Sequence, residues 1–471
     1  MSVVGSGPNG LAAAVIMARA GYEVSVYEAG SHFGGGLWTD RFEGFDGSFD
    51  VASAAHPMAL ASTFFRAFEI SRRVEFLTPR VSYGQAMVGR SAVAYRDLGR
   101  TVDELGRSGT GWSRVMRPLL ANIDAVRGLS GLELRAHPST VSGAAALASA
   151  VAGFSTLRAE ARALAAGATA HGAAPFGSLA ARFVGAVLAA EAHASGWPIP
   201  RGGSGAIAEA LVSDLIAHGG RLHADSTVND LREVWKPGDI AFLNIGPRGL
   251  ARIARDKLPT TYVRRLERYR YGNAASKVDF VLSGPVPWAD ARLQDAGTVH
   301  VGGSERDVSS AERQAWRGQV PLAPYVLVSQ PTRLDRSRLP QGSSDEVVWA
   351  YAHVPNGSAV DAVEMITSRI ETFAPGFRDL VIHREARPAP YFASVNANFE
   401  GGDVLGGRVD AAQLLTRPTV TARPWRTPIP GVYLASAATP PGAGVHGMAG
   451  WHAARLALRR IGQAAPYLGI D

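Results

Sequence analysis

Glycines with a fixed spacing near the amino terminus are the first residues whose types and order point to chemistry. They lie in the segment Gly5-Ser6-Gly7-Pro8-Asn9-Gly10. In such a turn the first glycine permits a tight bend, the second lets the backbone approach a diphosphate, and the third packs a helix against a strand. Glu28, 18 residues after Gly10, is placed to accept hydrogen bonds from ribose hydroxyls. The spacing therefore predicts a dinucleotide site formed by residues 5–10 together with Glu28 and Ala29.

The elements that must hold this turn can also be read from the sequence. Residues 2–4 predict a short strand, with a few residues expected before it, 11–19 an amphipathic helix, and 23–27 a second strand. A second glycine cluster over residues 30–39 would let another loop lie on the same diphosphate. NAD sites do not usually need that loop, so the cluster favours the longer FAD. Its predicted contacts are Gly35, Gly36, Leu37 and Trp38.

The carboxy-terminal region offers a second group of residues suited to the same ligand. A buried strand is predicted over 431–436, a glycine-rich turn over 439–447 and a helix over 448–460. The 24 residues after Gly447 are too few for another βαβ unit with its own ribose carboxylate. We therefore interpret the turn as directing the positive end of the helix at the pyrimidine edge of a flavin ring, where it stabilises negative charge. The predicted contacts are Ser436, Gly444, Val445, His446 and Gly447.

Composition excludes several other classes of chemistry. The chain has 471 residues, 46% of them hydrophobic, and no cysteine. The absence of cysteine removes disulfide frameworks, thiolate metal sites, iron–sulfur clusters and cysteine nucleophiles, so redox chemistry needs a cofactor. The formal charge of +7 comes from basic residues spread along the chain, without a dense run that is interleaved with aromatic residues. We therefore expect no nucleic acid partner.

No export signal or transmembrane segment is evident in the sequence. The first strand begins at Ser2, with no charged and apolar leader before it, so we expect an intracellular, cytoplasmic protein. The stretch from Val141 to Trp197 is rich in small apolar residues but is interrupted by charges. It predicts either closely packed helices or a patch that touches a membrane surface, and peripheral membrane association stays open.

Residues 5–39 and 439–453 together resemble the superfamily of FAD-dependent phytoene desaturases, carotenoid isomerases and amine oxidases, specifically its phytoene dehydrogenase-related branch. Segments in the middle of the chain carry the same resemblance, among them Ser195-Gly196-Trp197-Pro198, Tyr271-Gly272 with Lys277-Val278-Asp279, Gly297-Thr298-Val299-His300 and Ala352-His353-Val354-Pro355. The resemblance implies FAD as the cofactor. Further predicted contacts are His56, where the chain passes the flavin in that family, and Val228 and Asn244.

Two departures from the family pattern affect the site. Amine-oxidase relatives read Gly-Gly-Arg where this chain reads Gly35-Gly36-Leu37, so the usual arginine near the diphosphate is missing. The glycine-rich segment from Asn396 to Gly407 is interpreted as a mobile loop.

Length and the resemblance together imply an α/β protein of two domains. A Rossmann-like FAD-binding domain is expected to be discontinuous, over 1–75, 199–255 and 405–471, with a strand at 221–228. A substrate-binding domain that combines a mixed sheet with helices is expected over 76–198, mainly helical, and 256–404, with strands at 276–282, 297–302, 325–330 and 346–353. The glycines around Gly203 follow Trp197-Pro198-Ile199-Pro200, which cannot be a central strand, so they do not predict a second dinucleotide site.

Four side chains are candidates for proton transfer or substrate contact: His446, His56, His353 and Lys277. His446 is expected beside the flavin ring, either as a base or as a histidine held by the backbone of its turn. For His56, His353 and also His171, a catalytic role and a structural, hydrogen-bonded role both stay open. Lys277 would hold water or a substrate carboxylate, unless it is an ordinary surface lysine. No metal site is expected, because the sequence has no histidine cluster at metal spacing.

These features predict an FAD-dependent oxidoreductase that desaturates or dehydrogenates a largely apolar organic molecule by hydride or electron transfer to flavin N5. No second nucleotide fold is visible, so oxygen, a quinone or another acceptor is expected to reoxidise the flavin. A redox-neutral flavin isomerase and a flavin-bound scaffold without turnover are the alternatives.

Overall fold

A computed structural model describes residues 1–133, 138–175 and 177–470. The smaller of its two main sheets contains five parallel strands in the order β16-β10-β1-β2-β9. Their bounds are β1 (Ser2–Val4), β2 (Ser25–Tyr27), β9 (Arg221–His223), β10 (Ala241–Leu243) and β16 (Val432–Leu434). All five come from the three segments predicted for the FAD-binding domain, whose exact boundaries stay a prediction. The mixed α/β class predicted from the sequence is confirmed.

Three strands of this sheet are shorter than the sequence predicts. β16 covers only Val432–Leu434 of the predicted 431–436. β2 begins at Ser25 rather than at residue 23, and β9 ends at His223 rather than at residue 228. Asp225 adopts a left-handed φ of 49° and its N–H donates to the carbonyl of Gly30, so the chain turns away from β2. Residues 226–228 are thereby freed from the sheet and lie at its carboxyl edge.

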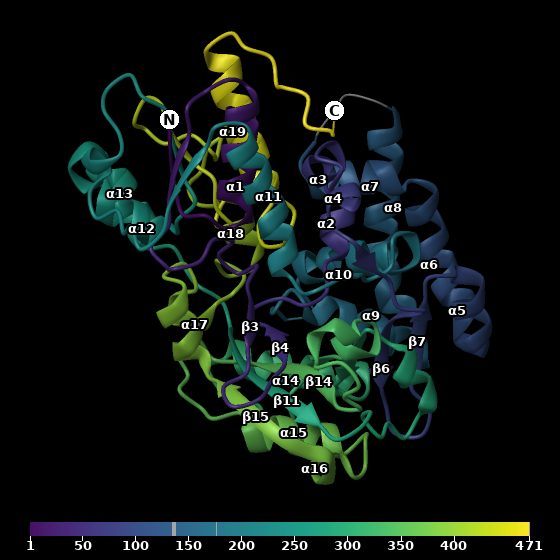
Figure 1. Cartoon of the computed structure of the whole chain (residues 1–471). Coiled ribbons are helices and arrows are strands. Elements are labelled where there is room, and N and C mark those ends of the chain that lie inside the picture. Colours follow the sequence, from purple (N-terminus) through teal and green to yellow (C-terminus); the bar gives the residue numbers. More distant parts are fainter. Residues whose placement is uncertain (134–137, 176, 471) are drawn as a thin grey trace.

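Three helices pack around this sheet: α1 (Pro8–Arg19), α11 (Gly205–Ala217) and α19 (Met448–Arg460). Figure 1 shows them close together at the top of the molecule. α1 begins three residues earlier than predicted, because the fixed φ of Pro8 suits the first turn of a helix. α19 lies so close to α1 that a Cβ on Gly450 would be 1.9 Å from the carbonyl oxygen of Asn9. The first and last helices of the chain therefore form one packed unit.

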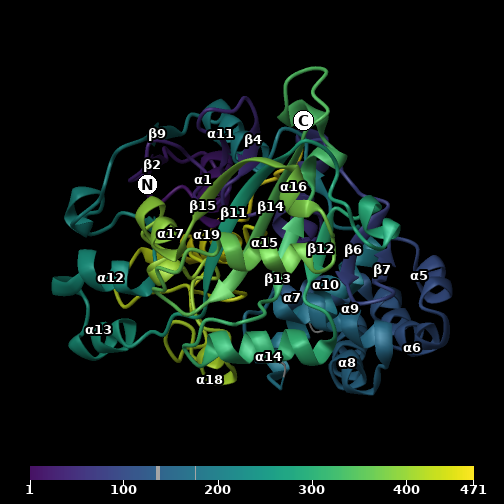
Figure 2. The same cartoon turned by 90° about the horizontal axis from the view of Figure 1, so that it is seen from below.

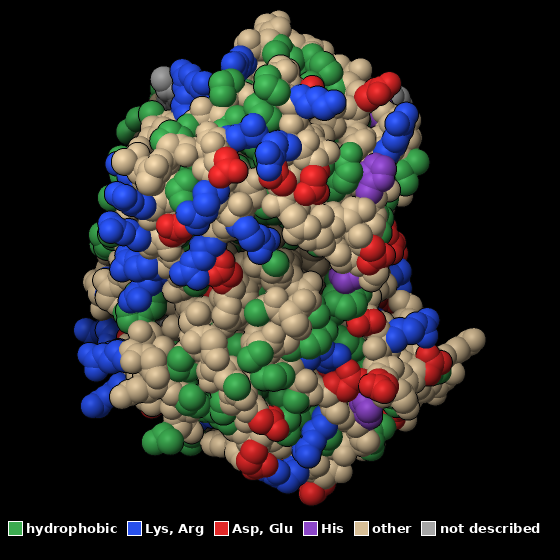
Figure 3. Space-filling model, turned by 90° about the vertical axis from the view of Figure 1, so that its left-hand side faces the viewer, with side chains coloured by type: hydrophobic (Ala, Val, Ile, Leu, Met, Phe, Trp, Pro, Cys, Tyr) green, Lys and Arg blue, Asp and Glu red, His purple; other side chains and the backbone are tan. Residues whose placement is uncertain are grey.

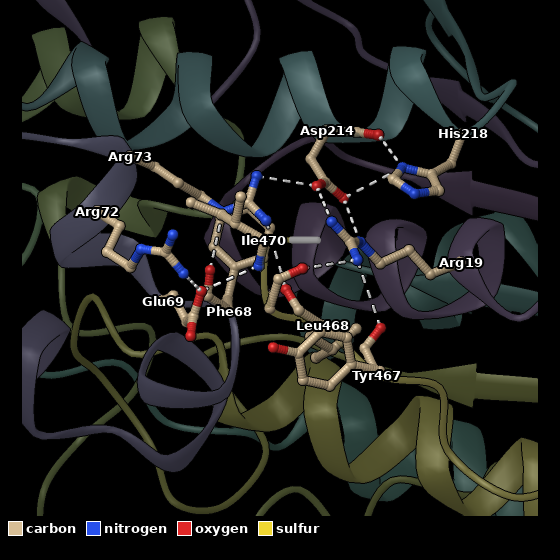
Figure 4. Close-up of polar contacts among 11 residues, drawn as sticks. Arg19, Phe68, Glu69, Arg72, Arg73, Asp214, His218, Tyr467, Leu468 and Ile470 are labelled. Carbon is tan, nitrogen blue, oxygen red and sulfur yellow. Dashed lines mark hydrogen bonds and ion pairs between the residues drawn. The ribbon is translucent and has the colours of Figure 1, made fainter.

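An ion cluster fastens the carboxy-terminal tail to this unit. The buried carboxylate of Asp214 accepts from Arg19 Nη2 at 2.6 Å and from Arg73 Nη1 at 3.0 Å, and Arg19 also donates to the carbonyl of Gly469. Figure 4 shows these side chains converging from α1, α11 and the short helix α4 (Ile70–Arg73). Because Asp214 is almost fully buried, losing either arginine would leave a poorly paired buried charge.

The larger sheet is mixed and has seven strands in the order β15-β11-β14-β13-β12-β6-β7. Figure 2 shows them side by side from left to right. Only β12 and β6 run parallel; the other neighbours are antiparallel. The bounds are β6 (Val81–Ala86), β7 (Ala92–Tyr95), β11 (Ala274–Leu282), β12 (Thr298–Val301), β13 (Val326–Ser329), β14 (Glu346–Val354) and β15 (Val381–Arg387). The 76–198 segment, predicted as mainly helical, thus also contributes β6 and β7.

The two faces of the larger sheet have different chemistry because successive side chains point to opposite sides. Val278 and Phe280 of β11 join the hydrophobic core beneath α15 (Val363–Glu371). Lys277 and Asp279 of the same strand point to the other face, where Lys277 Nζ donates to the carbonyl of Asp50. Polar and titratable residues therefore collect between the two sheets.

Helices from the 98–194 segment cover one end of the larger sheet, at the right of Figure 1. They are α5 (Leu98–Glu104), α6 (Gly109–Ala121), α7 (Ile123–Ser130), α8 (Pro138–Gly153), α9 (Ala159–Ala170) and α10 (Leu179–Ala194). The remaining helices are α2 (Pro57–Ala61), α3 (Thr63–Ala67), α12 (Pro247–Ile253), α13 (Thr260–Glu267), α14 (Glu305–Trp316), α16 (Phe377–Leu380), α17 (Ala389–Val395) and α18 (Ala411–Leu415). Two antiparallel pairs complete the fold: the hairpin of β3 (Thr39–Arg41) with β4 (Ser48–Asp50), and the long-range pair of β5 (Phe76–Leu77) with β8 (Ile199–Pro200). Within the described residues, none of the helices is both long and apolar enough to span a bilayer.

Basic side chains that are spread out in the sequence gather in space. Figure 3 faces the side that carries α12 and α13 and shows a column of Lys and Arg along one edge. Exposed residues on these helices include Arg252, Arg264 and Arg265. This face of the molecule therefore has a group of exposed basic side chains that come from neighbouring helices.

Candidate functional site

One cavity of about 990 Å³ lies between the two sheets. The carboxyl ends of four parallel strands open into it: Gly5 and Gly7 follow β1, Glu28 follows β2, Asn244 follows β10 and Ser436 follows β16. Open parallel sheets place their ligands at this edge. The same cavity continues to the far sheet, where Lys277 lines it.

Two glycine loops touch each other at the start of α1. A Cβ on Gly35 would lie 2.9 Å from the Cα of Gly7, and a Cβ on Gly7 would lie 2.6 Å from Asn244 Nδ2. No side chain caps the amino-terminal end of α1 at Gly7. Uncapped N–H groups and the positive end of the helix dipole favour phosphate there. The close approach of bare backbone therefore forms a cradle of the kind that a diphosphate occupies.

Asn244 ties the cradle to the strands behind it. With its amide oxygen turned toward the cradle, it accepts from the N–H of Gly7 at 3.0 Å, and its amide nitrogen then donates to the carbonyl of Ala435 at 3.0 Å. The side chain thus links the chain after β1, β10 and β16. Its predicted place at the cofactor edge agrees with its position in the cavity wall.

Glu28 is held in place by its own neighbours. Its Oε2 accepts from the N–H and the hydroxyl of Ser6, at 2.8 and 2.6 Å, and its Oε1 accepts from the N–H of Gly30 at 3.0 Å. The carboxylate lines the cavity and keeps lone pairs for a further donor. The contacts orient it before any ligand arrives, as a ribose-binding group requires.

Most of the predicted cofactor contacts line the cavity, and four do not. Those that do are Gly5, Gly7, Pro8, Asn9, Glu28, Ala29, Gly35, Gly36, Leu37, His56, Val228, Asn244, Ser436, Gly444, Val445 and His446. Ser6 instead orients Glu28, and Trp38 stacks on His32 with ring centroids 3.9 Å apart. Gly10 and Gly447 serve close packing, because a Cβ would lie 2.1 Å from the carbonyl of Gly5 and 2.4 Å from the ring of Phe64, respectively.

The glycine-rich turn over residues 439–447 presents His446 to the cavity, rather than free N–H groups of α19. The N–H of Met448 donates to His446 Nδ1 at 3.0 Å, and the N–H of Ala449 donates to Asn9 Oδ1 at 3.2 Å. These first donors of α19 are therefore already used within the protein, so the predicted effect of this helix on a flavin would come from its dipole rather than from these N–H groups. Burial lowers the pKa of His446 to about 4, so the ring is neutral. Since Nδ1 accepts, the proton sits on Nε2, which is buried; no described residue accepts from it with good hydrogen-bond geometry, although the backbone of Gly442 and Ala443 lies near enough to the ring to oppose part of the fall in pKa.

His56 has the same tautomer, with its proton on Nε2, but its unpaired nitrogen is Nδ1. The hydroxyl of Ser204 donates to the carbonyl of Ser53, so its oxygen accepts from His56 Nε2 at 2.7 Å. His56 Nδ1 then carries a lone pair, and it too is buried without a partner in the described part of the chain. Burial lowers the pKa of His56 to about 4. The cavity wall thus contains one neutral imidazole that can donate and one that can accept.

Lys277 is fully buried, so the expectation of a surface lysine is wrong. Its Nζ donates to the carbonyl of Asp50 and to Asp279 Oδ2, both at 2.7 Å, and Asp279 is also paired with Arg387. Burial lowers the pKa of Lys277 to about 8, against the opposing pull of Asp279. Two of its three donors are used, which leaves one for water or a ligand in the cavity.

His353 does not line the cavity. Its Nδ1 lies 2.8 Å from Glu312 Oε1, and both side chains are buried. The pair joins β14 to α14, which supports the structural role over the catalytic one. The segment 396–407, predicted to be mobile, is held by the buried carboxylate of Asp403, which accepts from the N–H groups of Gly272, Leu405 and Gly407.

Several cavity residues were missed by sequence reasoning. They share the inner face of the larger sheet: Thr298, Leu327, Ser329, Trp349 and Tyr351. Alternation along each predicted strand could have placed them with Lys277 on one face. Arg248, Asn396 and Asn398 line the opposite end, and no periodic signal marks them.

Comparison with known proteins agrees with this geometry. Residues 3–70 match the NAD(P)-binding Rossmann-like domain. Over 309 residues the chain is 22% identical to rat pyridine nucleotide-disulfide oxidoreductase domain-containing protein 2, a match that covers 56% of this chain and 52% of that protein. The chain thus spans about half the length of this relative.

Solved structures share the fold along nearly the whole chain. A double mutant of putrescine oxidase superposes with a TM-score of 0.62 at 17% identity and covers 98% of both chains. Cyclohexylamine oxidase from Brevibacterium oxydans gives a TM-score of 0.54 at 14% identity, again with 98% of both chains covered. The Rossmann-like domain predicted from the glycine turn is thus confirmed, and the overall fold is shared with putrescine oxidase and cyclohexylamine oxidase. The narrower resemblance to phytoene dehydrogenases is not specifically supported.

Proposed function

We propose that the protein is an FAD-dependent oxidoreductase that acts on a largely apolar organic substrate. The observation that carries the proposal is the continuity of one cavity from the glycine cradle to the inner face of the larger sheet. Its volume of about 990 Å³ is at the upper end of the ~300–1,000 Å³ usual for ligand sites. Such a space suits a long dinucleotide together with a second molecule better than a dinucleotide alone.

The residues of the cavity fit FAD. The paired loops at Gly7 and Gly35 suit the diphosphate, and Glu28 suits a ribose. When bound, FAD supplies the capacity to accept a hydride or electrons. An NAD site would use the cradle and Glu28 but would not account for the second glycine loop or for the distant part of the cavity.

At the other end, the chain provides matched polar groups for a ring and a reacting substrate. His446 offers an N–H donor and His56 a lone pair, each buried and preset by its hydrogen bonds. Lys277 offers one free donor from the opposite sheet. We propose that Lys277 and His56 position the reacting atoms or a water molecule, and that His446 donates to the cofactor.

The substrate portion of the cavity is mainly apolar. Its wall on the α10 side contains Phe183, Val184, Val187 and Leu188, and the sheet adds Leu327 and Trp349. Such a lining excludes ions and favours hydrocarbon or aromatic groups. We therefore infer a desaturation or dehydrogenation of an apolar molecule, of the phytoene dehydrogenase-like kind, with oxygen, a quinone or another small acceptor as the oxidant. Phe183 is partly exposed and Leu179 largely so, which supports the proposal of peripheral membrane contact at this mouth.

Anaerobic stopped-flow absorbance of the purified protein tests the proposal. The protein should retain FAD, and its absorption band near ~450 nm should bleach with at least one member of a panel of polyenes, amines and amino-acid-derived compounds. Lys277→Met should slow the bleaching, whereas His353→Phe, whose site lies off the cavity, should not. Activity that requires pre-reduced flavin would select the isomerase instead, and retained FAD that no compound bleaches would select the scaffold. A colourless protein that binds NAD and refuses FAD would overturn the proposal.

A further inference from the structure

Two histidines from different halves of the chain meet at the far end of the cavity. His171 directly follows α9, and His300 lies in β12. Their Nε2 atoms are 3.0 Å apart. The pair is enclosed by the rings of Trp197, Tyr83 and Tyr325, whose centroids lie 5.1 to 5.7 Å from one or other imidazole. Burial lowers the pKa of both histidines, that of His171 to about 3, so both rings are neutral and one must donate to the other.

The surroundings of His300 determine which ring donates. Gln85 Nε2 donates to the carbonyl of Gly303 at 2.8 Å. This hydrogen bond fixes the orientation of the Gln85 amide, so that its Oε1 points away from Gly303. Gln85 Oε1 and His300 Nδ1 are both buried without a partner among the described residues. Both lie beside Gly167, at 2.4 and 2.2 Å from the point where its Cβ would be. The two atoms do not hydrogen-bond to each other as placed, but a proton on His300 Nδ1 is the arrangement that avoids opposing lone pairs, because the amide oxygen can only accept.

This tautomer sets the chemistry of His171. A neutral His300 with its proton on Nδ1 has a lone pair on Nε2, so His171 Nε2 is the donor between the rings. His171 Nδ1 then carries a lone pair. His171 lines the cavity, whereas His300 does not, and no described residue supplies a donor to its Nδ1. The lone pair of His171 Nδ1 is thus an unused hydrogen-bond acceptor in a part of the cavity whose other walls are mostly apolar.

We propose that His171, oriented by His300 and Gln85, is a specificity-determining residue that accepts a hydrogen bond from a hydroxyl or N–H group of the substrate. The inference rests on the proposed function and narrows its substrate class to elongated apolar molecules with one hydrogen-bond donor. Direct cross-strand partners form a row from Lys277 through Tyr351 and Leu327 to His300. Three strand spacings of about 4.8 Å separate the row's ends, so His300, which bonds to His171, lies roughly 14 Å from Lys277 along the sheet.

Nitrogen-15 NMR of histidine-labelled holoprotein tests the tautomers without any substrate. The resonances of His171 should report a proton on Nε2, and those of His300 a proton on Nδ1. His193 is an internal reference, because it accepts from Trp112 Nε1 at its Nε2 and faces the carbonyl of Tyr95 with its Nδ1, which requires the proton on Nδ1. The single variants His171→Phe and His300→Phe assign the signals. A proton on His171 Nδ1 would overturn the proposal.

Two probes of nearly the same shape test the recognition. Indole carries an N–H donor, and benzofuran has a ring oxygen in its place. Calorimetric titration of the holoprotein should show indole binding about tenfold more tightly, the scale of one neutral hydrogen bond, and indole alone should shift the His171 Nδ1 resonance. His171→Phe should remove the preference with FAD content unchanged, whereas His193→Phe should keep it.

Equal affinities of the wild-type protein for the two probes, or binding of neither, would overturn the proposal. Loss of the preference in His193→Phe as well would also overturn it, because that result would reflect general loosening of the helices. Failure of the proposed function is separately visible, since it would appear as a protein without flavin before any probe is added.

Discussion

Replacing Gly35 by alanine tests the diphosphate cradle directly. Gly35 has a φ of +59°, and its Cβ would lie 2.9 Å from the Cα of Gly7. Because contacting carbon atoms prefer about 3.5–4.0 Å, the two loops would have to separate by roughly 0.6 Å or more. The left-handed backbone adds about 1–2 kcal/mol of strain for a residue with a Cβ. Both effects act where we propose that one diphosphate is held.

The expected result is a weaker affinity for FAD in a folded protein. Hydrogen bonds to charged groups are worth about 1.5–3 kcal/mol, so misplacing one should raise the Kd for FAD about 10- to 100-fold. Quenching of flavin fluorescence during titration of the flavin-free protein with FAD measures this. Gly89→Ala is the matched control, since Gly89 has a φ of +82° but no atom within 4 Å of its Cβ position. Unchanged FAD affinity in Gly35→Ala would refute the cradle, and equal weakening in both variants would assign the effect to strain alone.

Three other changes test burial and packing. Burial lowers the pKa of Lys277 from 10.5 to about 8, so above pH 8 the unfolded chain binds a proton that the folded chain has released. Urea titrations should therefore show that the difference in unfolding free energy between the wild-type protein and Lys277→Met rises by up to roughly 3 kcal/mol between about pH 8 and 10.5. If this difference instead falls as the pH rises, the argument is wrong. His353→Phe should lower the unfolding free energy by about 1–3 kcal/mol in calorimetry, because the Glu312 carboxylate loses its partner, while FAD content stays at the wild-type level. Gly450→Ala should abolish soluble expression, since its Cβ would lie 1.9 Å from a backbone carbonyl of α1, and a soluble variant of normal melting temperature would contradict that packing.

The parts of the site that are local in sequence could be predicted from it. The turn from Gly5 to Gly10, Glu28 and the helix over 448–460 depend on short-range spacing, and the structure places the turn and Glu28 at one sheet edge. Their steric requirements are met within a few residues, so a motif can encode them. The bound of β9 was less predictable, because the turn at Asp225 and not hydrophobicity ends that strand.

The buried charges and the histidine pair were harder to predict for a different reason. Lysine is almost never fully buried without a partner, so a surface position was the natural expectation for Lys277. Its partner Asp279 was visible in the sequence, because residues i and i+2 share a strand face, but the second cation, Arg387, comes from β15. His171 and His300 are 129 positions apart, and only the packing of α9 on the sheet brings them together. Such contacts depend on strand register and on helix packing, which no local sequence pattern specifies.

The register of the larger sheet also relates the proposed reaction site at Lys277 to the proposed substrate-recognition site at His171 within one cavity. From Lys277 to His300, the row of cross-strand partners is charged at the first residue, mainly apolar at Tyr351 and Leu327, and polar again at the last. His171 lines the cavity and bonds to His300 at the end of this row, so His171 and Lys277 would give a long molecule two anchoring points and a preferred direction. A single anchor would let an apolar substrate slide along the floor, because hydrophobic contact is not directional. In the proposed mode of binding, the spacing of these strands would determine which part of the substrate lies beside Lys277, even though the two ends of the row are far apart in sequence.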